Sequence, residues 1–444
     1  MVKRTSDYDE EDVRIRANPR GSRPRTRQRP EHEDAADAMV IAVDRGRYTC
    51  LLERDPFEPA KPDRSGRTGK TGKGKAKAAA PAPVERRLVT AMKARELGRK
   101  GVVVGDKVSL VGDLQGGPDA LARVVRVHPR ERVLRRTADD TDPVERIIVA
   151  NADQLVIVTA LADPEPRPRM IDRCLVAAFE AGLAPVLCLT KSDLADPAEL
   201  LASYLPLGIT AVATRAGRVA GGPDAPGPGD GLDELREILA GKVSVLVGHS
   251  GVGKSTLVNA LVPAADRAVG HVNDVTGRGR HTSTSAVALR LPPVVLSPAR
   301  AAAATSAAAA AAEDLSAEVS VEPDESEGSI QALAEGWVID TPGIRSFGLA
   351  HIGPNGVIAA FPDLAAVTAE CPRGCTHAAD ASDCMLDSWL ADLGAAAGKP
   401  EQAEDAAEVA ALLAAQYATA KARVDSIRRL LSALNPQPIG AASD

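Results

Sequence analysis

The 444-residue sequence contains no apolar run that approaches the ~20 residues of a membrane-spanning helix. Its N-terminus, MVKRTSDYDEEDVR, also lacks the apolar core of a secretion signal. We therefore expect a cytoplasmic protein without a membrane partner, and a monomer by default. Because 44% of the residues are hydrophobic, the chain can still bury a sizeable core, and its length predicts about two to four domains.

Cysteine is scarce, with six residues in the chain. Three of them lie between positions 371 and 384, and in a cytosolic protein such a cluster favours a metal site over disulfides. The other three are scattered, and we expect them to be buried core thiols: Cys50, Cys174 and Cys188.

The net charge of −6 conceals an uneven distribution. Residues 1–140 contain 32 Lys and Arg against 22 Asp and Glu, whereas the rest of the chain is acidic. A basic N-terminal third indicates contact with a polyanion, such as nucleic acid. Basic tails are also often merely solvated, and charge alone leaves that alternative open.

Short Val- and Ile-rich runs separated by turns fill residues 37–140, for example GVVVGDKVSLVG and ALARVVRVHPR. This spacing predicts a five-stranded β-barrel of the OB type, a fold that often binds RNA. A barrel that only packs against its neighbour is the alternative. Residues 59–83 interrupt the pattern with a Gly-, Lys- and Pro-rich segment, which we expect to be a mobile basic loop.

From residue 147 onward, apolar strands alternate with amphipathic helices. We expect a strand over 147–161, followed by helices and strands up to the strand VSVLVG at 243–248. This alternation predicts a parallel α/β sheet covered on both faces. Residues 297–334 are Ala-rich and then acidic, which indicates a mobile insertion, and a long helix is expected at about 401–433.

A complete phosphate-binding motif, GHSGVGKS, directly follows the strand VSVLVG and precedes an expected helix. Its glycines let backbone N–H groups surround phosphate oxygens at the helix N-terminus. We expect Lys254 to reach the β- and γ-phosphates as a catalytic group and Ser255 to ligate Mg²⁺. The predicted nucleotide-binding residues of this segment are Gly248, His249, Ser250, Gly251, Val252, Gly253, Lys254, Ser255 and Thr256.

Two further motifs complete the predicted nucleotide site. VIDTPG ends a strand with Asp340, which can hold Mg²⁺ through water, while Gly343 can offer its N–H to the γ-phosphate. TKSD ends the apolar strand APVLCLT, and its carboxylate can accept hydrogen bonds from guanine N1 and N2, a donor pair that adenine lacks. The predicted base-reading residues are Thr190, Lys191, Ser192 and Asp193, with Ala213 and Thr214 as candidates for the loop behind the base.

GRGRHTSTSA lies between the phosphate loop and DTPG, where the first switch segment of a GTPase belongs. Thr282 or Thr284 can ligate Mg²⁺ there, and we expect Thr282 in this role. Ile344 stands where Ras-like GTPases carry a water-orienting Gln, so the catalytic group must come from elsewhere or from a partner. His281 is the one ring of this segment able to orient water, although a solvated loop histidine is the alternative.

The segment ECPRGCTHAADASDCML supplies Cys371, Cys375, His377 and Cys384. Three thiolates and one imidazole in so short a segment suit one closed tetrahedral structural Zn²⁺ site, which has no open position for catalysis.

The motif order is base reader, phosphate loop, switch segment and DTPG, which is a circular permutation of the usual GTPase order. With ANADQ and CPRGCTH added, the chain over about 37–433 resembles the ribosome small-subunit-dependent GTPase A family, circularly permuted GTPases with OB and zinc domains. The resemblance implies a GTPase that binds the small ribosomal subunit and its rRNA late in maturation and is stimulated by the subunit. It also implies that His281 is the catalytic group.

The resulting fold class is multi-domain, with a β-barrel, a central circularly permuted α/β GTPase domain and a mainly helical zinc domain. We expect a disordered tail at 1–36, the barrel at 37–140, the GTPase domain at 141–350 and the zinc domain and tail at 351–444. The departures from the family are Thr190 in place of Asn, the two insertions, the basic tail, the loop after ITAVAT and a zinc spacing that differs by one residue. Two rivals remain, namely an ATPase or kinase and a non-catalytic RNA-binding assembly module that uses GTP as a structural ligand.

Overall fold

The computed structural model describes residues 32, 34–52, 87–98, 101–117, 120–137, 145–215, 230–262, 286–295, 333–341, 349, 352–397 and 406–434. The predicted tail at 1–36 and the insertion at 59–83 lie almost wholly outside these residues. The insertion predicted at 297–334 does so as well, except for its last two positions.

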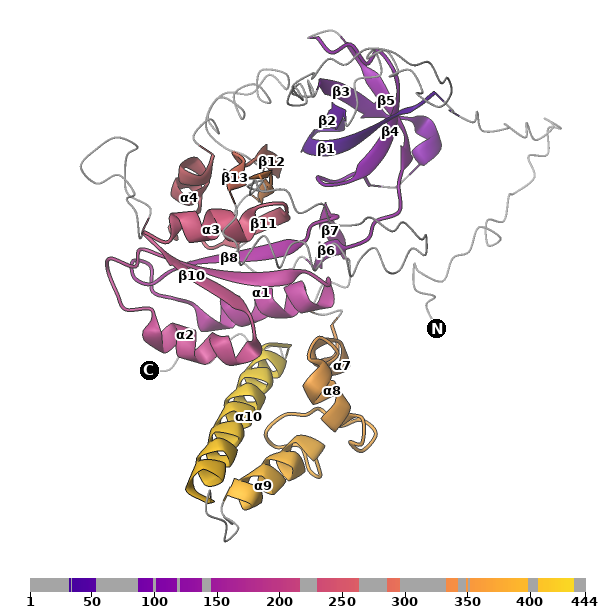
Figure 1. Ribbon diagram of the computed structural model, residues 1–444. Coiled ribbons are helices and arrows are strands. Elements are labelled where there is room, and N and C mark those ends of the chain that lie inside the picture. The colour runs from indigo at the N-terminus through magenta and orange to yellow at the C-terminus, as the bar shows by residue number, and fades with distance from the viewer. Residues whose placement is uncertain are drawn as a thin grey trace, which may run out of the picture. The chain divides into compact units, whose positions relative to one another are not determined.

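The N-terminal strands form a closed β-barrel (Figure 1), which confirms the predicted OB-type fold. Its strand order is β1-β2-β3-β5-β4, and pairing of β4 with β1 closes the ring. Side chains alternate between the two sides as in β3, where Val89 and Ala91 are buried while Leu88 and Met92 are exposed. The strands are β1 (Ala36–Asp44), β2 (Arg47–Leu52), β3 (Leu88–Lys93), β4 (Lys107–Gly112) and β5 (Ala122–Val127).

The single strand predicted over 147–161 is wrong, because the chain forms two strands there. β7 (Arg146–Ala150) pairs with β6 (Val133–Arg136), and β8 (Gln154–Ala160) enters the central sheet. Between them Asn151 adopts a φ of 54°, a left-handed conformation that asparagine tolerates better than most residues. Its side-chain amide donates to the carbonyl of Gly105, which stabilises the turn.

The central sheet has the order β10-β9-β8-β11-β15-β12. All neighbours are parallel except β12, which runs antiparallel to β15. One residue pair, Ala42 with Val287, joins β12 to β1 of the barrel. The elements are β8, α1 (Pro168–Glu180), β9 (Ala184–Thr190), α2 (Ala198–Tyr204), β10 (Thr210–Thr214), α3 (Leu232–Leu239), β11 (Val243–Gly248), α4 (Lys254–Leu261), β12 (Val287–Arg290) and β15 (Trp337–Asp340).

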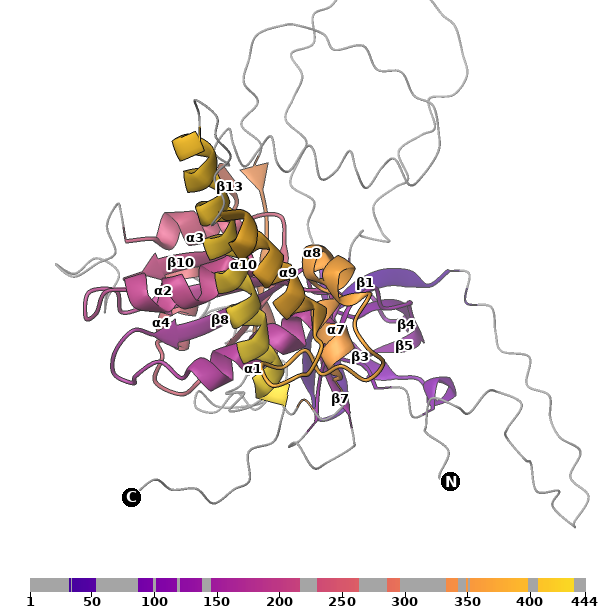
Figure 2. The ribbon, with the colours of Figure 1, turned by 90° about the horizontal axis from the view of Figure 1, so that it is seen from below.

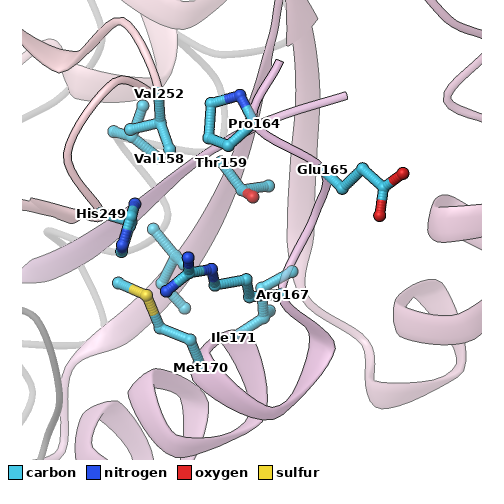
Figure 3. A pocket seen from close by; sticks show the side chains of 10 residues that line it. Val158, Thr159, Pro164, Glu165, Arg167, Met170, Ile171, His249 and Val252 are labelled. Atoms are coloured by element: carbon cyan, nitrogen blue, oxygen red, sulfur yellow. The ribbon is translucent and has the colours of Figure 1, made fainter. Parts of the chain in front are cut away.

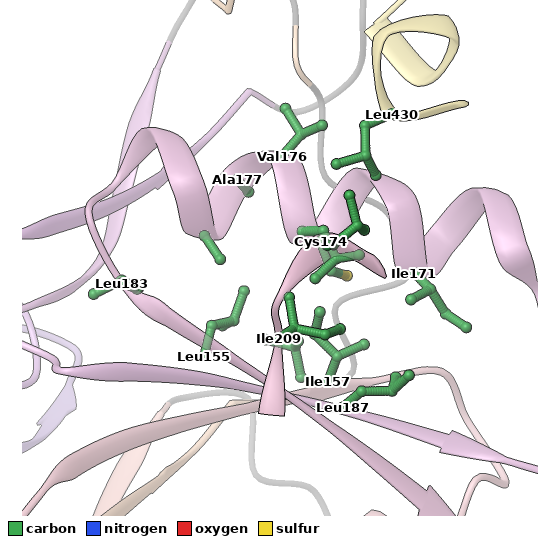
Figure 4. Packing of buried hydrophobic residues seen from close by; sticks show 14 of the residues in the cluster. Leu155, Ile157, Ile171, Cys174, Val176, Ala177, Leu183, Leu187, Ile209 and Leu430 are labelled. Carbon is green, nitrogen blue, oxygen red and sulfur yellow. The ribbon is translucent and has the colours of Figure 1, made fainter. Parts of the chain in front are cut away.

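Helices cover both faces of this sheet, as the alternation of strands and helices along the sequence predicts. On one face Leu155 and Ile157 of β8 pack with Ile171 of α1 in a large cluster that also contains Leu430 of the C-terminal helix (Figure 4). On the other face Val156 and Val158 of the same strand pack with residues of α3 and α4. Parallel strands buried on two sides require such continuous apolar sequences.

The scattered cysteines are buried core thiols, as predicted. Cys50 lies in the barrel core, Cys174 in α1 and Cys188 in β9. Burial raises the pKa of each of these thiols to about 12, so they stay protonated and unreactive at neutral pH.

The C-terminal part consists of helices, with the long helix close to its predicted bounds (Figure 2). Its last turns pack on the central domain, where Leu430 and Ile427 are fully buried. None of the helices in the described part of the chain has the length and apolar character that crossing a bilayer requires. The helices are α7 (Pro354–Ile358), α8 (Pro362–Thr368), α9 (Met385–Ala397) and α10 (Ala406–Leu434).

Candidate functional site

The phosphate-binding motif connects β11 to α4, in the context that the sequence predicted. Gly248 ends β11 so close to β8 that a Cβ atom there would lie 2.6 Å from the carbonyl oxygen of Val158, which excludes any larger residue. Gly253, the N-cap residue directly before α4, has a φ of 87°, a conformation that favours glycine. The loop therefore needs both glycines to present its backbone N–H groups at the start of the helix.

The residues of the loop differ in exposure. Ser250, Gly251, Ser255 and Thr256 are exposed, whereas Val252 is buried beneath them. His249 is partly exposed, and its Nδ1 lies 2.7 Å from the carbonyl oxygen of Ser250. The surface of the loop is thus accessible to a ligand, while Val252 anchors it to the core.

Lys254 and Asp340 form an ion pair at the centre of the site. Strand β15 runs parallel to β11, with Asp340 beside Leu246, and this register brings the carboxylate to the first turn of α4. The Lys254 ammonium also donates to the carbonyl oxygen of Thr341 at 2.7 Å. The Thr341 hydroxyl in turn donates to the carbonyl oxygen of Leu246, which fixes the end of β15. The cation that we expect to bind phosphate and the carboxylate that we expect to hold Mg²⁺ therefore lie side by side.

The TKSD segment lies at the same edge of the sheet. Thr190 is the last residue of β9 and is buried, whereas Asp193 is exposed beyond the strand end. Lys191 has a φ of 58°, and its ammonium donates to the carbonyl oxygen of Asp163 in the loop after β8. Ser192 donates its backbone N–H to the carbonyl oxygen of Thr214.

The two candidates for the loop behind the base end the neighbouring strand. Thr214 pairs with Thr190 across β10 and β9, and Ala213 precedes it. Gly231 packs directly against the end of β10, and a Cβ atom on it would lie 1.9 Å from the carbonyl oxygen of Ala213. The predicted base-reading and phosphate-binding segments thus occupy one edge, at the carboxyl ends of the parallel strands, where open α/β sheets bind ligands.

The loop after β8 is the part of this edge that the sequence analysis missed. Pro164 of this loop lines a pocket together with Arg167 and Met170, near the start of α1, and with His249 and Val252 (Figure 3). The turn-forming run DPEPRP after an apolar strand was the available signal, because segments that follow parallel strands gather at the same edge.

Several predicted site residues lie outside the described residues. They are His281, Thr282 and Thr284 of the predicted switch segment, and Gly343 and Ile344 after Asp340. Their roles stay predictions.

The Cys/His cluster precedes α9. The ligand atoms of Cys371, Cys375, His377 and Cys384 all lie within 4.8 Å of one another, so this group can hold a metal ion. The Nδ1 of His377 lies 3.5 Å from the sulfur of Cys371 and 3.8 Å from that of Cys384. A tetrahedron around zinc with bonds of about 2.3 Å has edges of about 3.8 Å, so these distances suit the donor set.

Backbone and side-chain contacts orient these ligands. The N–H of Met385 donates to the sulfur of Cys371, and the N–H of His377 donates to that of Cys375. Burial, with a smaller effect of Arg428, holds the pKa of His377 below its usual value, which favours the neutral imidazole that metals bind. Arg428 of α10 also donates to the carbonyl oxygen of His377 and so links the cluster to the long helix.

Comparison with known proteins identifies relatives for much of the chain. The family model described as RsgA GTPase matches residues 127–297. The proteins named small ribosomal subunit biogenesis GTPase RsgA from Pseudomonas fluorescens (strain SBW25) and from Pseudomonas aeruginosa (strain LESB58) are each 34% identical over 283 residues, which are 62% of this chain and 66% of theirs. The chain thus matches slightly less than two thirds of the length of these relatives.

Among solved structures, the crystal structure of YjeQ from Thermotoga maritima is 21% identical, with a TM-score of 0.47 over 86% of this chain and 99% of that one. Over the residues that they match, the family model and the sequence relatives show that this chain is similar to the RsgA GTPase family.

Proposed function

We propose that this protein is a GTPase that binds the small ribosomal subunit late in its maturation, in the cytoplasm, and hydrolyses GTP to GDP and phosphate with stimulation by the subunit. The observation that carries the proposal is the meeting of TKSD, the phosphate loop and Asp340 at one edge of the sheet. Similarity to the RsgA GTPase family model and the names of the sequence relatives support it.

In this proposal each motif has a separate task. The exposed carboxylate of Asp193 accepts the two hydrogen bonds that guanine offers and adenine does not. The N-terminal turn of α4 and Lys254 bind the phosphates, with the Lys254 ammonium moving from Asp340 to a phosphate oxygen. Mg²⁺ held by Ser255 and Asp340, and by Thr282, would neutralise charge on the phosphates when bound.

Hydrolysis itself requires a water molecule oriented toward the γ-phosphorus. Ile344 has no polar group for this task, so we assign it to His281, as the family resemblance implies. Attack of the water forms a P–O bond as the bond to the β-phosphate oxygen breaks. Release of GDP and phosphate then ends the bound state.

The other two domains would provide binding to the subunit. The barrel carries exposed arginines on two of its strands, Arg47 on β2 and Arg123 on β5, which suit contact with rRNA phosphates. The Cys/His cluster would hold one structural Zn²⁺, because all four donors are protein groups and none of its positions is open to a substrate.

The testing experiment is GTP turnover by the purified protein, alone and with isolated small ribosomal subunits, with ATP as the control nucleotide. Strong stimulation of GTP turnover by the small subunit supports the proposal. Equal, slow turnover with and without the subunit would contradict the proposed partner. GTP binding without turnover in either case would favour a non-catalytic assembly module.

A further inference from the structure

A charged side chain of the long helix, Arg428, reaches the Cys/His cluster. Its Nε donates to the carbonyl oxygen of His377 at 3.3 Å, and its Nη2 donates to the carboxylate of Asp387 in α9 at 2.8 Å. The sulfur of Cys384 is a further hydrogen-bond partner of the same guanidinium. Because only 14% of the Arg428 side chain is exposed, this cation lies against the cluster and mostly out of water.

The cluster with zinc bound has a charge that needs compensation. Three thiolates and a neutral imidazole bring three negative charges to a divalent ion, which leaves one negative charge over. Cys384 is 1% exposed and His377 is 5% exposed, so water solvates this charge poorly. The backbone N–H groups that donate to the sulfurs of Cys371 and Cys375 supply partial charges, whereas Arg428 supplies a full positive charge.

Arg428 also restrains the backbone of one ligand. His377 has a φ of 54°, which lies in the left-handed region and is unfavourable for a residue with a Cβ atom. The hydrogen bond from Arg428 holds the carbonyl group of His377 in this conformation. The imidazole is therefore held in place by α10 as well as by its own loop.

The ion pair between Arg428 and Asp387 offers a simpler explanation, in which the two residues only join α10 to α9. In that case the loss of either partner would have the same effect. Their charges act on the thiolates in opposite directions, however, since Arg428 attracts them and Asp387 repels them. Removing each charge in turn therefore separates a role in joining the helices from an effect on the metal.

We propose that Arg428 is a positioning residue of the metal site, which offsets the charge of the zinc-bound thiolates and holds His377. Because the neighbouring Arg429 binds Asp172 of α1, this part of α10 contacts both the metal site and the central domain. The inference rests on the zinc site of the proposed function and deepens it, since the site then extends beyond its four ligands to a residue 51 positions from His377.

The test measures the affinity of the full-length protein for Zn²⁺ by competition with a chromophoric chelator. Arg428→Gln removes the charge and should weaken zinc binding about 10- to 100-fold, the usual effect of losing an outer partner of metal ligands. Arg428→Lys keeps the charge with a less suitable geometry, so its affinity should lie between those of Arg428→Gln and the wild type. Asp387→Asn removes the opposing charge and should bind Zn²⁺ at least as tightly as the wild type.

The Co²⁺-loaded proteins give a second measurement, which a role in joining helices alone would not change. Loss of a positive charge beside thiolate sulfur raises the energy of the sulfur electrons. The absorption band for charge transfer from sulfur to cobalt should therefore move to longer wavelength in Arg428→Gln. Arg423→Gln is the matched control, because Arg423 lies on the same helix and pairs with Asp363 of α8. It should leave the zinc affinity and the band unchanged.

The outcomes separate the two claims. Zinc affinity at the wild-type level in Arg428→Gln, or an equal loss of affinity in Asp387→Asn, would overturn the inference and leave the GTPase proposal intact. If Arg428→Gln does not fold, Arg428→Lys decides in its place, since the inference requires it to bind Zn²⁺ less tightly than Asp387→Asn does. If the wild-type protein binds no Zn²⁺, the proposed zinc site fails and the inference fails with it, while GTP turnover still tests the proposed GTPase.

Discussion

The Nε atom of Arg429 lies 3.1 Å from Oδ1 of Asp172, which joins α10 to α1. The carboxylate of Asp172 is almost fully buried, with an exposed side-chain fraction of 5%. The same guanidinium lies 4.5 Å above the ring of Tyr204 and donates to the carbonyl oxygen of Ser203. One side chain of the C-terminal helix therefore contacts both helices, α1 and α2, on this face of the central sheet.

We expect Arg429→Ala to destabilise the protein by about 2–3 kcal/mol, because it leaves a buried carboxylate without its cation. The melting temperature should fall by roughly 5–10 °C, which differential scanning calorimetry measures. Lys421→Ala is the control on the same helix. It breaks an exposed pair with Asp425 one turn away and should leave the melting temperature unchanged. Equal effects of the two substitutions would contradict the structural role of Arg429.

The loss of folding stability caused by Arg429→Ala should grow with pH. Burial raises the pKa of Asp172 above its ordinary value of 3.8, and Arg429 opposes this effect. Without Arg429 the pKa rises further, so the folded variant binds a proton more readily than the unfolded chain does. Stability is then lost as pH rises through the folded pKa. Melting curves at pH 5 and pH 8 should show the larger difference from the wild type at pH 8.

Asp193→Asn should change which base the protein binds. In the proposed function the carboxylate accepts from two guanine N–H groups, whereas the amide oxygen of asparagine would accept one of these bonds. We expect GDP binding to weaken about 100-fold and binding of xanthosine diphosphate to improve, because xanthine has a carbonyl where guanine has its amino group.

Competition between these nucleotides measures this preference. Asp196→Asn is the matched control, since Asp196 is exposed three positions later and accepts a hydrogen bond from the N–H of Ala198. It should bind GDP like the wild type. An unchanged preference in Asp193→Asn would assign base recognition to another residue.

Cys375→Ala should abolish metal binding by the Cys/His cluster. The cluster then has three donors, and we expect the purified variant to lose its zinc, as measured by atomic absorption. The C-terminal part should become sensitive to protease and binding to the small subunit should weaken, while GDP affinity stays nearly unchanged.

Cys50→Ala is the control for this variant, because Cys50 is buried in the barrel and far along the chain from the cluster. It should retain one equivalent of zinc. Zinc retained by Cys375→Ala as well would exclude Cys375 as a ligand.

His281→Ala should bind GTP normally and lose stimulation by the small subunit. The reason is chemical, since the substitution removes the group that we assign to orienting water and spares the phosphate and base contacts. Single-turnover hydrolysis with and without subunits measures the effect. His271→Ala is the control, because this histidine precedes the predicted switch segment in the sequence. It should hydrolyse GTP like the wild type. Normal stimulation of His281→Ala would contradict the assignment.

Much of the fold could be predicted because the strongest sequence signals are local. Alternation in β3 and the continuous apolar run of β9 identify barrel and sheet strands without tertiary information. The break at Asn151 could not be predicted in this way, since the apolar pattern continues on both sides of it. The turn depends on the amide of Asn151 reaching Gly105, and this contact is distant in sequence.

In the candidate site too, the local features could be predicted from the sequence, whereas the contacts between distant residues could not. The phosphate loop is a contiguous motif and could be located from sequence, including its position between a strand and a helix. The hydrogen bond of Thr190 to Val252 joins residues 62 positions apart, so the sequence could assign Thr190 only by its neighbours in TKSD. The contact between Lys191 and Asp163 also joins residues that are distant in sequence, so the sequence did not predict it.

The order of the strands has a consequence for synthesis of the protein. The base-reading strand β9 precedes β11, and β15, which carries Asp340, follows both, yet β11 lies between β8 and β15 in the sheet. Because the chain is synthesised from the N-terminus, the barrel strands and the predicted base-reading segment are synthesised before the phosphate loop. In the proposed function, a nascent chain therefore lacks Asp340, the proposed Mg²⁺ ligand, until β15 has left the ribosome.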